Sequence, residues 1–372
     1  MDTFIHSIET KVPRFRFSQS DARDHLKEQL DDRRARKVID RISDRSEIET
    51  RHSVVEDWGS ESPEALFRTG PGGKWVEPGT EERNQVFAGA SRQMAVELAS
   101  KVLSRSTQFP AGEVTHVVTA SCTGFYSPGP DFYIVKELGL KPSVERYHLG
   151  FMGCYASIPA LRMARQFCEA NPDAVVLVVS IELCSLHLHL NGKDLESLVA
   201  DMLFSDGAAA ALVSARPPRP GSAAYKLGKF GSTLLPTKER AMTWTLGNQG
   251  FKMSLSSFLP HLLGANIQPA IEPLLESQHL EMGDVDNWAV HPGGKAILDK
   301  VGEALGLRPE QLSVSREVLR RYGNMSSATI LFVLDRFMQQ MNGGPEDQVT
   351  LAAAFGPGLT VETALLTLMR PS

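Results

Sequence analysis

Short apolar runs alternate along the chain with stretches whose apolar positions repeat at a helical period. Strands are expected over Val114–Ala120, Ala174–Ile181, Ala208–Ser214, Asn287–Val290 and Val349–Phe355. These runs are almost wholly apolar, which is typical of strands that are covered on both faces. Helices are expected over 33–45, over Ala160–Ala170, after His291 to about Leu305, and over Ala328–Gln340.

Alternating buried strands and helices in both halves predict an α/β fold with mostly parallel sheets. The Pro- and Gly-rich segment Arg216–Gly221 (RPPRPG) is the clearest linker, so the expected halves are residues 1–217 and 218–372. In such folds, ligands bind beyond the carboxyl ends of the strands. Catalytic and ligand-binding residues are therefore expected in the connections that follow the strands.

Composition narrows the class of protein. The chain has 372 residues, 42% hydrophobic and 22% charged, with a net charge of -5, so no general affinity for nucleic acid or anionic membrane is expected. No apolar run is long enough for a membrane span, and the N-terminus lacks a secretory pattern. The four cysteines are far apart and form no CxxC pair. We expect a cytoplasmic protein with reduced thiols, without a zinc site or a disulfide scaffold.

Cys154 is the first candidate for chemistry. It follows Gly153, where a strand gives way to a helix, and Pro159 requires that this helix begin near Cys154–Ile158. The positive end of a helix dipole favours a thiolate, and a glycine permits the strained turn. A buried structural cysteine is an equally good interpretation of this position alone.

His291 and Asn324 are the other two candidates. His291 ends a strand before Pro292-Gly293-Gly294, a loop that would hold an imidazole rigidly with space in front of it. Asn324 follows Gly323, where asparagine usually serves a turn or a helix cap. Taken singly, each is more simply a structural residue. Together with Cys154 they offer a nucleophile, a base and an amide donor.

Papain-like proteases carry cysteine, histidine and asparagine in the same chain order. The surroundings of Cys154, GFMGCYAS, lack the protease pattern C-G-S-C-W. A disulfide-free chain is also a poor match to that class, so a cysteine peptidase is disfavoured.

Five motifs resemble one family. The chain resembles the type III polyketide synthases, the chalcone-synthase-like condensing enzymes, in these segments: Met152–Ala156 (MGCYA), Phe204–Ala209 (FSDGAA), His291–Asp299 (HPGGKAILD), Arg321–Ala328 (RYGNMSSA) and Phe355–Thr363 (FGPGLTVET). The resemblance runs from about residue 41 to the C-terminus. Ser121–Gly124 and Trp244 look more like bacterial than plant members.

This resemblance implies the thiolase fold, two similar βαβα halves in five αβαβα layers, usually as a homodimer. It implies that Cys154 carries the acyl starter and the growing chain. His291 would hold the thiolate and, with Asn324, polarise the malonyl thioester carbonyl. Acyl-CoA and malonyl-CoA would be substrates, and neither a cofactor nor a metal is expected.

The resemblance also implies the residues that bind substrate. Phe204 would be the gatekeeper between the CoA tunnel and the cavity, and Ser326 would line that cavity. Arg41 and Arg45, with Lys37 nearby, match basic positions that contact CoA phosphates. For these three cations, a solvated helix face is the alternative.

Departures from the family pattern fall in the cavity. The second cavity phenylalanine is replaced by Met253, plant threonines by Cys122, Cys184 and His187, and a wall glycine by Trp244. Ser127 stands where a plant subunit lends a methionine to its partner. Because methionine and cysteine impose no flat slot and a linear chain gains from any apolar tunnel, we expect an aliphatic acyl-CoA starter. The expected products are short pyrones or resorcinols, with Trp244 limiting the extensions.

Two alternatives remain at this stage. One is a single-condensation ketoacyl synthase of the thiolase superfamily, which would require a carrier protein. The other is an inactive scaffold that only binds acyl-CoA, which the presence of all three chemical residues disfavours. The motifs GNMSS and FGPGLTVET favour an iterative polyketide synthase, an acyltransferase.

Overall fold

A mixed nine-stranded sheet organises the part of the chain that the structure describes, in the order β11-β12-β13-β8-β1-β7-β6-β4-β5. The computed structural model describes every residue except 107, 191–194, 237–240, 342–346 and 372. The strands of this sheet are β1 (Phe4–Lys11), β4 (His116–Ser121), β5 (Glu145–Gly150), β6 (Val175–Leu183), β7 (Asp206–Ser214), β8 (Ala224–Leu234), β11 (Asn287–Val290), β12 (Gln348–Gly356) and β13 (Thr360–Met369).

The expectation of mostly parallel sheets is wrong. β4 pairs in parallel with β5 and β6, and β11 pairs in parallel with β12, whereas every other neighbouring pair in this sheet is antiparallel. A wholly apolar run indicates that a strand is covered on both faces, and it carries no information on strand direction. β1, β8 and β13 were not among the expected strands, and they supply most of the antiparallel pairs.

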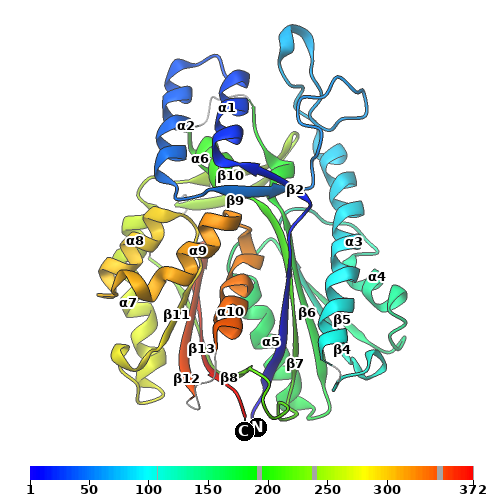
Figure 1. Ribbon diagram of the computed structural model, residues 1–372, viewed down its shortest axis with the longest axis vertical. Coiled ribbons are helices and arrows are strands. Elements are labelled where there is room, and N and C mark those ends of the chain that lie inside the picture. The colour runs from blue at the N-terminus through cyan, green and yellow to red at the C-terminus, as the bar shows by residue number, and fades with distance from the viewer. Residues whose placement is uncertain (107, 191–194, 237–240, 342–346, 372) are drawn as a thin grey trace.

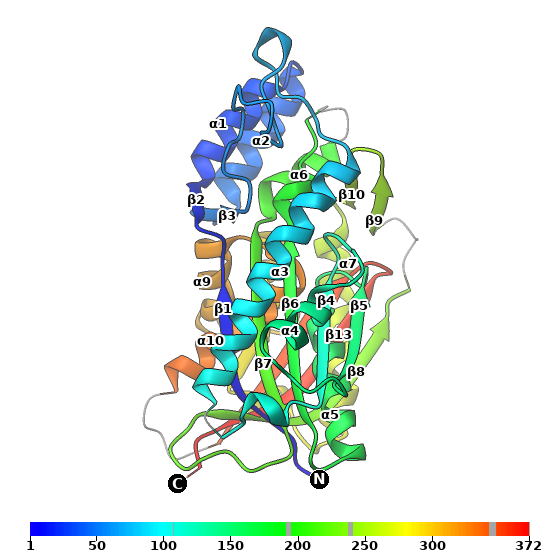
Figure 2. The same cartoon turned by 90° about the vertical axis from the view of Figure 1, so that its right-hand side faces the viewer.

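The helices form three layers around the two halves of this sheet (Figure 1). α3 (Thr80–Arg105) and α4 (Pro130–Glu137) cover the outer face of the N-terminal half, which Figure 2 shows from the side. α5 (Ser157–Ala170) and α10 (Thr329–Gln340) lie between the halves, and α7 (Leu259–Glu276) and α8 (Lys295–Ala304) cover the other outer face. The chain therefore has the five-layer αβαβα arrangement of the thiolase fold.

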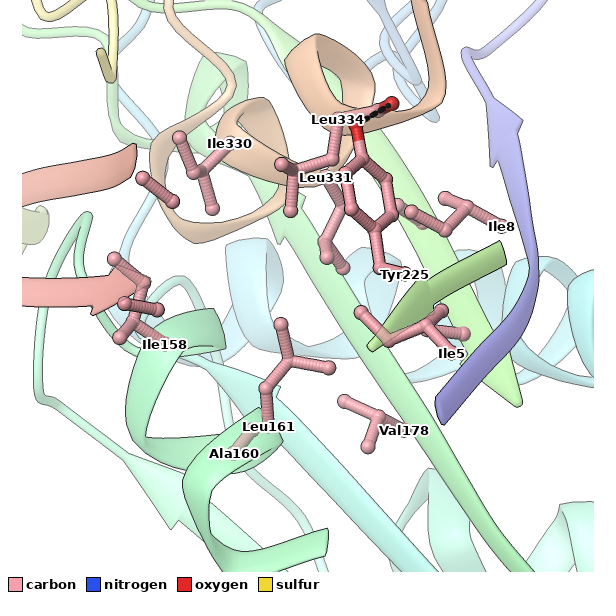
Figure 3. Close-up of a cluster of buried hydrophobic side chains, with 14 of the residues drawn as sticks. Ile5, Ile8, Ile158, Ala160, Leu161, Val178, Tyr225, Ile330, Leu331 and Leu334 are labelled. Atoms are coloured by element: carbon pink, nitrogen blue, oxygen red, sulfur yellow. Dashed lines mark hydrogen bonds between the residues drawn. The ribbon is translucent and has the colours of Figure 1, made fainter. Parts of the chain in front are cut away.

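The two halves share a core where the central helices meet both parts of the sheet. Figure 3 shows Ile158 and Leu161 of α5, Tyr225 of β8 and Ile330 of α10 in this cluster. Tyr225 is fully buried, and its hydroxyl donates to the carbonyl oxygen of Leu334 over 3.0 Å. This satisfies the one polar group that the ring brings into the core.

A cap of smaller elements lies above the carboxyl ends of the parallel strands (Figure 1). It consists of the hairpin β2 (Phe15–Ser18) and β3 (Thr50–Ser53), α1 (Gln19–Gln29), α2 (Arg33–Arg45), α6 (Leu195–Leu203), and the hairpin β9 (Met242–Gly247) and β10 (Gly250–Leu255). Ser18 and Asp32 cap the first turns of α1 and α2 through their side chains. None of the helices in the described ranges is both long and apolar enough to cross a membrane.

Candidate active site

Cys154 lies in the connection between β5 and α5, at the carboxyl-end side of the sheet. Gly153 has a φ of 90°, and a Cβ there would lie 2.3 Å from Cδ of Pro357. Only glycine therefore lets the chain turn at this point while the Pro357 loop packs against it. α5 begins at Ser157, with Pro159 in its first turn, as expected from the sequence.

Burial, rather than the helix dipole, dominates the acidity of Cys154. The residue is 4% exposed, and burial raises the pKa of its thiol to about 12. Hydrogen bonds from Ser326 and Asn324 oppose this shift without reversing it. The expected thiolate is therefore not supported, because the apolar surroundings of Cys154 disfavour the charged form.

His291 follows β11 directly and is 1% exposed. Its backbone N–H donates to the carbonyl of Ala353 on β12 over 2.8 Å. Neither ring nitrogen has a hydrogen-bond partner within the described part of the chain, and burial lowers the pKa of the imidazole to about 3. The ring is neutral, and one of its nitrogens carries a proton that it can donate to a ligand.

Asn324 has a side-chain amide whose orientation is determined by its own turn. The backbone N–H of Ser326 donates to Oδ1 of Asn324 over 2.9 Å, so the NH₂ group must point the other way. Nδ2 donates to the carbonyl of Gly293 at 3.3 Å, and the Asn324 side chain opposes the rise in the pKa of the Cys154 thiol. Asn324 therefore accepts the turn hydrogen bond that is expected of a structural asparagine. Its NH₂ group still provides hydrogen-bond donors at the site.

These three residues meet around the end of β12. The His291 backbone binds β12 at Ala353, and a Cβ on Gly356, at the end of this strand, would lie 3.4 Å from the backbone nitrogen of Cys154. Asn324 contacts Gly293, two residues beyond His291. The structure therefore brings the three sequence candidates into one region, although they lie far apart in the chain.

A cavity of about 370 Å³ opens in front of Cys154. Eight of the sequence candidates line it: Cys122, Cys154, Cys184, His187, Phe204, Trp244, Met253 and Ser326. His291 and Asn324 are not among the lining residues, and neither are Lys37, Arg41 and Arg45. Within the described ranges, no group of three or more histidine, cysteine or carboxylate side chains is arranged to hold a metal ion.

One wall of the cavity is an aromatic and imidazole cluster. The His187 ring stacks on Phe251 with centroids 4.2 Å apart, and Trp244 stands perpendicular to both rings. The backbone N–H of Phe251 donates to Nδ1 of His187, so Nε2 carries the proton and donates to the Thr123 carbonyl over 2.7 Å. Burial lowers the pKa of His187 to about 3, which keeps it a neutral part of this wall.

Glu182 is a polar group at the site that the sequence reasoning missed. Its carboxyl group is fully buried and accepts hydrogen bonds from the Cys122 backbone N–H at 3.0 Å, the Cys122 thiol at 3.1 Å and the Thr123 hydroxyl at 3.0 Å, as well as from the Ser327 hydroxyl. Burial raises the pKa of this carboxyl group, although the hydrogen bonds oppose the shift. A single acid in the apolar strand Val175–Leu183 was the signal that could have identified it.

Arg51 is the second residue that the sequence reasoning missed. It is 6% exposed, and its Nη1 donates to the carbonyl oxygens of Asp201 at 2.6 Å and Phe204 at 2.9 Å. Its side chain also packs close to Gly323, since a Cβ there would lie 3.2 Å from Cγ of Arg51. Arg51 thus braces the Phe204 backbone and the turn before Asn324, and nothing in its local sequence indicates this role.

Phe204 and Asn324 are connected directly through the backbone. The two residues form an isolated parallel bridge, in which Asn324 donates to Leu203 and Ser205 donates to Asn324, both over 2.9 Å. A displacement of the Phe204 backbone would therefore also displace the backbone of Asn324, which carries the side-chain amide.

The three expected CoA contacts lie on one exposed face of α2. Lys37, Arg41 and Arg45 are spaced four residues apart, so their side chains follow one another along the helix. None of them forms an ion pair with a carboxylate in the described part of the chain. Just beyond α2, Glu47 pairs with Lys295 at the start of α8 over 3.2 Å, which joins this end of α2 to the loop after His291.

Comparison with known proteins gives consistent matches over the whole chain. Residues 3–217 match the N-terminal domain of the chalcone and stilbene synthases, and residues 227–370 match the C-terminal domain. The alpha-pyrone synthesis polyketide synthase-like Pks18 of Mycobacterium tuberculosis is 34% identical over 98% of this chain and 91% of its own length. The probable polyketide synthase 1 of Dictyostelium discoideum is 30% identical over 98% of this chain and 11% of its own length.

Solved structures agree with this result. PKS-I from the brown alga Ectocarpus siliculosus superimposes with a TM-score of 0.89 at 29% identity, covering 99% of this chain and 98% of its own. The C-terminal type III polyketide synthase domain of Steely1, a type I/III hybrid from Dictyostelium, superimposes with a TM-score of 0.86 at 27% identity, covering 99% and 100%.

Proposed function

The chain belongs to the chalcone and stilbene synthase family and is a type III polyketide synthase, and from this we propose that Cys154 carries the acyl chain while His291 and Asn324 bind the malonyl thioester. Members of this family are acyltransferases that use CoA thioesters. The residue roles, the starter, the product and the assembly are our proposals for this chain.

Loading of the starter begins with a neutral pair. Because burial keeps the Cys154 thiol protonated and the His291 imidazole neutral, the proton passes from sulfur to the ring as the sulfur attacks the acyl-CoA carbonyl. The carbon–sulfur bond to CoA then breaks. The leaving thiolate of CoA takes the proton back from the imidazolium, which leaves the acyl group on Cys154 and a neutral His291.

Extension uses His291 and Asn324 as hydrogen-bond donors. The malonyl thioester oxygen accepts from the His291 ring N–H and from Nδ2 of Asn324. When the carbon–carbon bond to the carboxylate breaks, CO₂ leaves and its bonding pair forms an enolate, whose oxyanion these two donors stabilise. The enolate carbon attacks the acyl thioester on Cys154, a new carbon–carbon bond forms, and the cysteine sulfur leaves. Transfer of the extended chain back to Cys154 permits another cycle.

The orientation of the Asn324 amide is the observation that carries this proposal. Because Ser326 occupies Oδ1, the amide offers only N–H donors towards the nucleophile. CO₂ release from malonyl-CoA, without any starter, tests the donors separately from loading. We expect the wild-type protein to release CO₂ and His291→Ala to release it at least about a hundredfold more slowly. Equal rates in both proteins would refute the proposed roles.

We also propose that Lys37, Arg41 and Arg45 bind the phosphates of CoA. Their side chains are exposed on one face of α2 and form no ion pair with the carboxylates that the structure describes. This supports the proposal, since a protein of net charge -5 needs local cations for such a ligand. The ion pair between Glu47 and Lys295 keeps this face near the loop that carries His291.

We propose an aliphatic acyl-CoA starter and short pyrone or resorcinol-type products. Cys122, Cys184 and Met253 line the same cavity as Cys154, and these soft side chains adapt to a flexible chain. Trp244 and Phe204 are also among the residues that line this cavity. A planar aromatic starter would gain most from two stacked rings, and Met253 replaces one of the two expected rings.

We further propose a homodimer in the cytoplasm. Phe125 is 52% exposed and Phe151 is 39% exposed, and both rings pack on Phe251, the residue behind the cavity wall. Exposed aromatic rings that gather in one place are typical of a protein interface. The four cysteines are free, which suits a reducing compartment. Light scattering of the wild type and of Phe125→Ser tests the assembly, with a dimer expected only for the wild type.

A further inference from the structure

β3 is bonded residue by residue to the segment that carries Phe204. The segment 204–206 leaves the carboxyl end of α6 and enters β7, and Phe204 lines the cavity together with Cys154. Three consecutive positions of this segment are held from β3 and the residue that follows it: Nη1 of Arg51 donates to the Phe204 carbonyl at 2.9 Å, the His52 N–H to Oγ of Ser205 at 2.8 Å, and the Val54 N–H to Oδ2 of Asp206 at 2.8 Å. The position of this part of the cavity wall therefore depends on β3.

The same strand holds the end of α9 (Ser313–Tyr322), which leads into the turn of Asn324. Oγ1 of Thr50 donates to the Arg321 carbonyl at 2.5 Å, and the residue before Thr50 donates its backbone N–H to the Arg320 carbonyl at 2.8 Å. β3 is therefore attached both to the cavity wall and to the helix before Asn324, although these two segments lie far apart in the chain.

Gly323, directly before Asn324, is enclosed between these two attachments. It has a φ of 70°, and a Cβ there would lie 3.1 Å from Cβ of Ser205 and 3.2 Å from Cγ of Arg51. The turn that sets the Asn324 amide is therefore packed between the segment 204–206 and the aliphatic part of the Arg51 side chain, which is why a glycine stands there.

Arg51 joins the two segments through different parts of one side chain. Its Nη1 donates to the carbonyl oxygens of Asp201 at 2.6 Å and Phe204 at 2.9 Å, both at the carboxyl end of α6. The last carbonyls of a helix lack partners within it, and the helix dipole favours a cation there. Burial lowers the pKa of the guanidinium to about 10, although the carboxyl groups of Asp201 and Asp206 oppose the shift, so Arg51 remains charged at neutral pH. The Phe17 ring covers it, with its centroid 5.3 Å from Cζ.

We propose that Arg51 is a positioning residue that fixes the amide donors of Asn324 relative to the cavity wall at Phe204, so that the malonyl thioester meets the acyl group on Cys154 in one geometry. Arg51 acts through these two backbone segments and not on the reacting atoms. This inference rests on the proposed role of Asn324 as a hydrogen-bond donor to the malonyl thioester. It adds a residue that sets the geometry of the reaction.

The proposal separates the two halves of the reaction. Loading uses Cys154 and His291, whereas CO₂ release also needs the Asn324 amide, to which Arg51 is linked through the packing around Gly323. A misplacement on the order of 1 Å costs about a hundredfold in rate. Arg51 variants should therefore slow CO₂ release far more than acylation of Cys154, whereas a residue that only stabilises the fold would affect both equally.

Arg51→Met and Arg51→Lys test this difference. Methionine keeps an apolar stem beside Gly323 and removes the donors, and lysine keeps the charge and a donor for one carbonyl. CO₂ release from malonyl-CoA is compared with acylation of Cys154 by hexanoyl-CoA, followed by intact mass in the first turnover. We expect CO₂ release to fall at least about tenfold in Arg51→Met and by less in Arg51→Lys, with acylation within about threefold of the wild-type rate in both.

Arg162→Met is the matched control. Arg162 lies on α5, and its Nη2 donates to the Gly231 carbonyl at 3.0 Å and pairs with Glu362, so it also joins backbone segments through a half-buried guanidinium. This variant should lower the melting temperature, as Arg51→Met does, and leave the ratio of CO₂ release to acylation unchanged.

A double-mutant cycle tests whether Arg51 acts through the amide. In an Asn324→Asp background the amide donors are already absent, so Arg51→Met should slow CO₂ release by no more than about twofold further, because residues that act as one unit are not additive. Fully additive losses would overturn the inference.

The other outcomes also decide the matter. Equal losses of CO₂ release and acylation in both Arg51 variants, or no loss in either, would make Arg51 a support of the fold only. If Asn324→Asp releases CO₂ at the wild-type rate, the proposed role of Asn324 fails instead. A crystal structure of Arg51→Met then tests the positioning directly, because the segments 204–206 and 323–326 should shift relative to β12 by about 0.5 Å or more. Unmoved segments would refute the proposal.

Discussion

The indole N–H of Trp244 donates to the carbonyl oxygen of Cys122 over 2.6 Å. This bond ties the β9–β10 hairpin to the segment after β4, and it holds the Trp244 ring across one side of the cavity. Met253 faces Trp244 in the register of the hairpin. Trp244 is therefore held in place in the cavity wall by a hydrogen bond and by its neighbours.

Replacing Trp244 should change product length. Trp244→Gly removes the ring from the cavity wall, so the chain should fold into more space and products with more extension units should appear by mass spectrometry. Trp244→Phe retains an aromatic ring and loses only the N–H donor, and we expect its products to keep the wild-type length. Unchanged products in Trp244→Gly would remove this residue from the wall that limits extension.

Asn324→Asp is the sharpest test of the amide donor. The substitution keeps an oxygen to accept from the Ser326 N–H and removes the NH₂ group that faces Cys154. We expect CO₂ release from malonyl-CoA to fall by roughly 10²–10³ in a protein that still folds, with a lower melting temperature because the new carboxylate is 2% exposed and faces the Gly293 carbonyl. Asn324→Ala also loses the turn bond and should be less stable. Near-normal CO₂ release in the Asp variant would return Asn324 to a purely structural role.

Cys154 should be the first of the four cysteines to react with iodoacetamide. It borders the cavity, whereas Cys168 lies in the core, the Cys122 thiol donates to the Glu182 carboxyl group, and burial raises the pKa of Cys184 well above the ordinary range. Since a raised pKa keeps the thiol protonated, the rate should increase about tenfold per pH unit from pH 7 to 10. Peptide mapping with time identifies the site. A rate that is already constant at pH 7 would show an ionic pair with His291.

Arg41 and Arg45 can be tested with two kinds of substrate. Arg41→Ala and Arg45→Ala should each raise the KM for acyl-CoA by about two- to fivefold, because exposed charge pairs are worth little more than this. The effect should shrink at high salt and be absent for pantetheine analogues that lack the phosphates. Arg34→Ala, another exposed cation on α2, is the control. Equal effects on both kinds of substrate would contradict a phosphate contact.

The starter class is tested by specificity constants for decanoyl-, benzoyl- and coumaroyl-CoA and for malonyl-CoA alone. We expect decanoyl-CoA to be the best of the four, because each buried methylene of a flexible chain adds to binding. A tenfold advantage for coumaroyl-CoA, or efficient synthesis from malonyl-CoA alone, would contradict an aliphatic starter.

Much of the architecture was predictable from local pattern. The run Asn287–Val290 is β11 to the residue, and the basic stretch over 33–45 is α2, because apolar and polar spacing is a property of a few neighbouring residues. The strands β1, β8 and β13 escaped prediction. Their sequences mix apolar residues with threonine, lysine, glutamate or glycine. β1 pairs with strands that lie far away in the chain, since Phe4 is opposite Ser214 of β7 and Lys226 of β8.

For the site, the sequence by itself determined which residue types stand at the ends of the strands: a cysteine after Gly153, a histidine after β11 and an asparagine after Gly323. Only the tertiary structure decided how they behave. The raised pKa of Cys154 and the contact of the Asn324 amide with Gly293 depend on groups brought together from distant segments. The same holds for the burial of the His291 ring, which has no hydrogen-bond partner among the described residues. The roles of Glu182 and Arg51 could not be predicted from the sequence for the same reason. Desolvation and hydrogen bonding depend on residues that are close in space, and the local sequence does not show which residues those are.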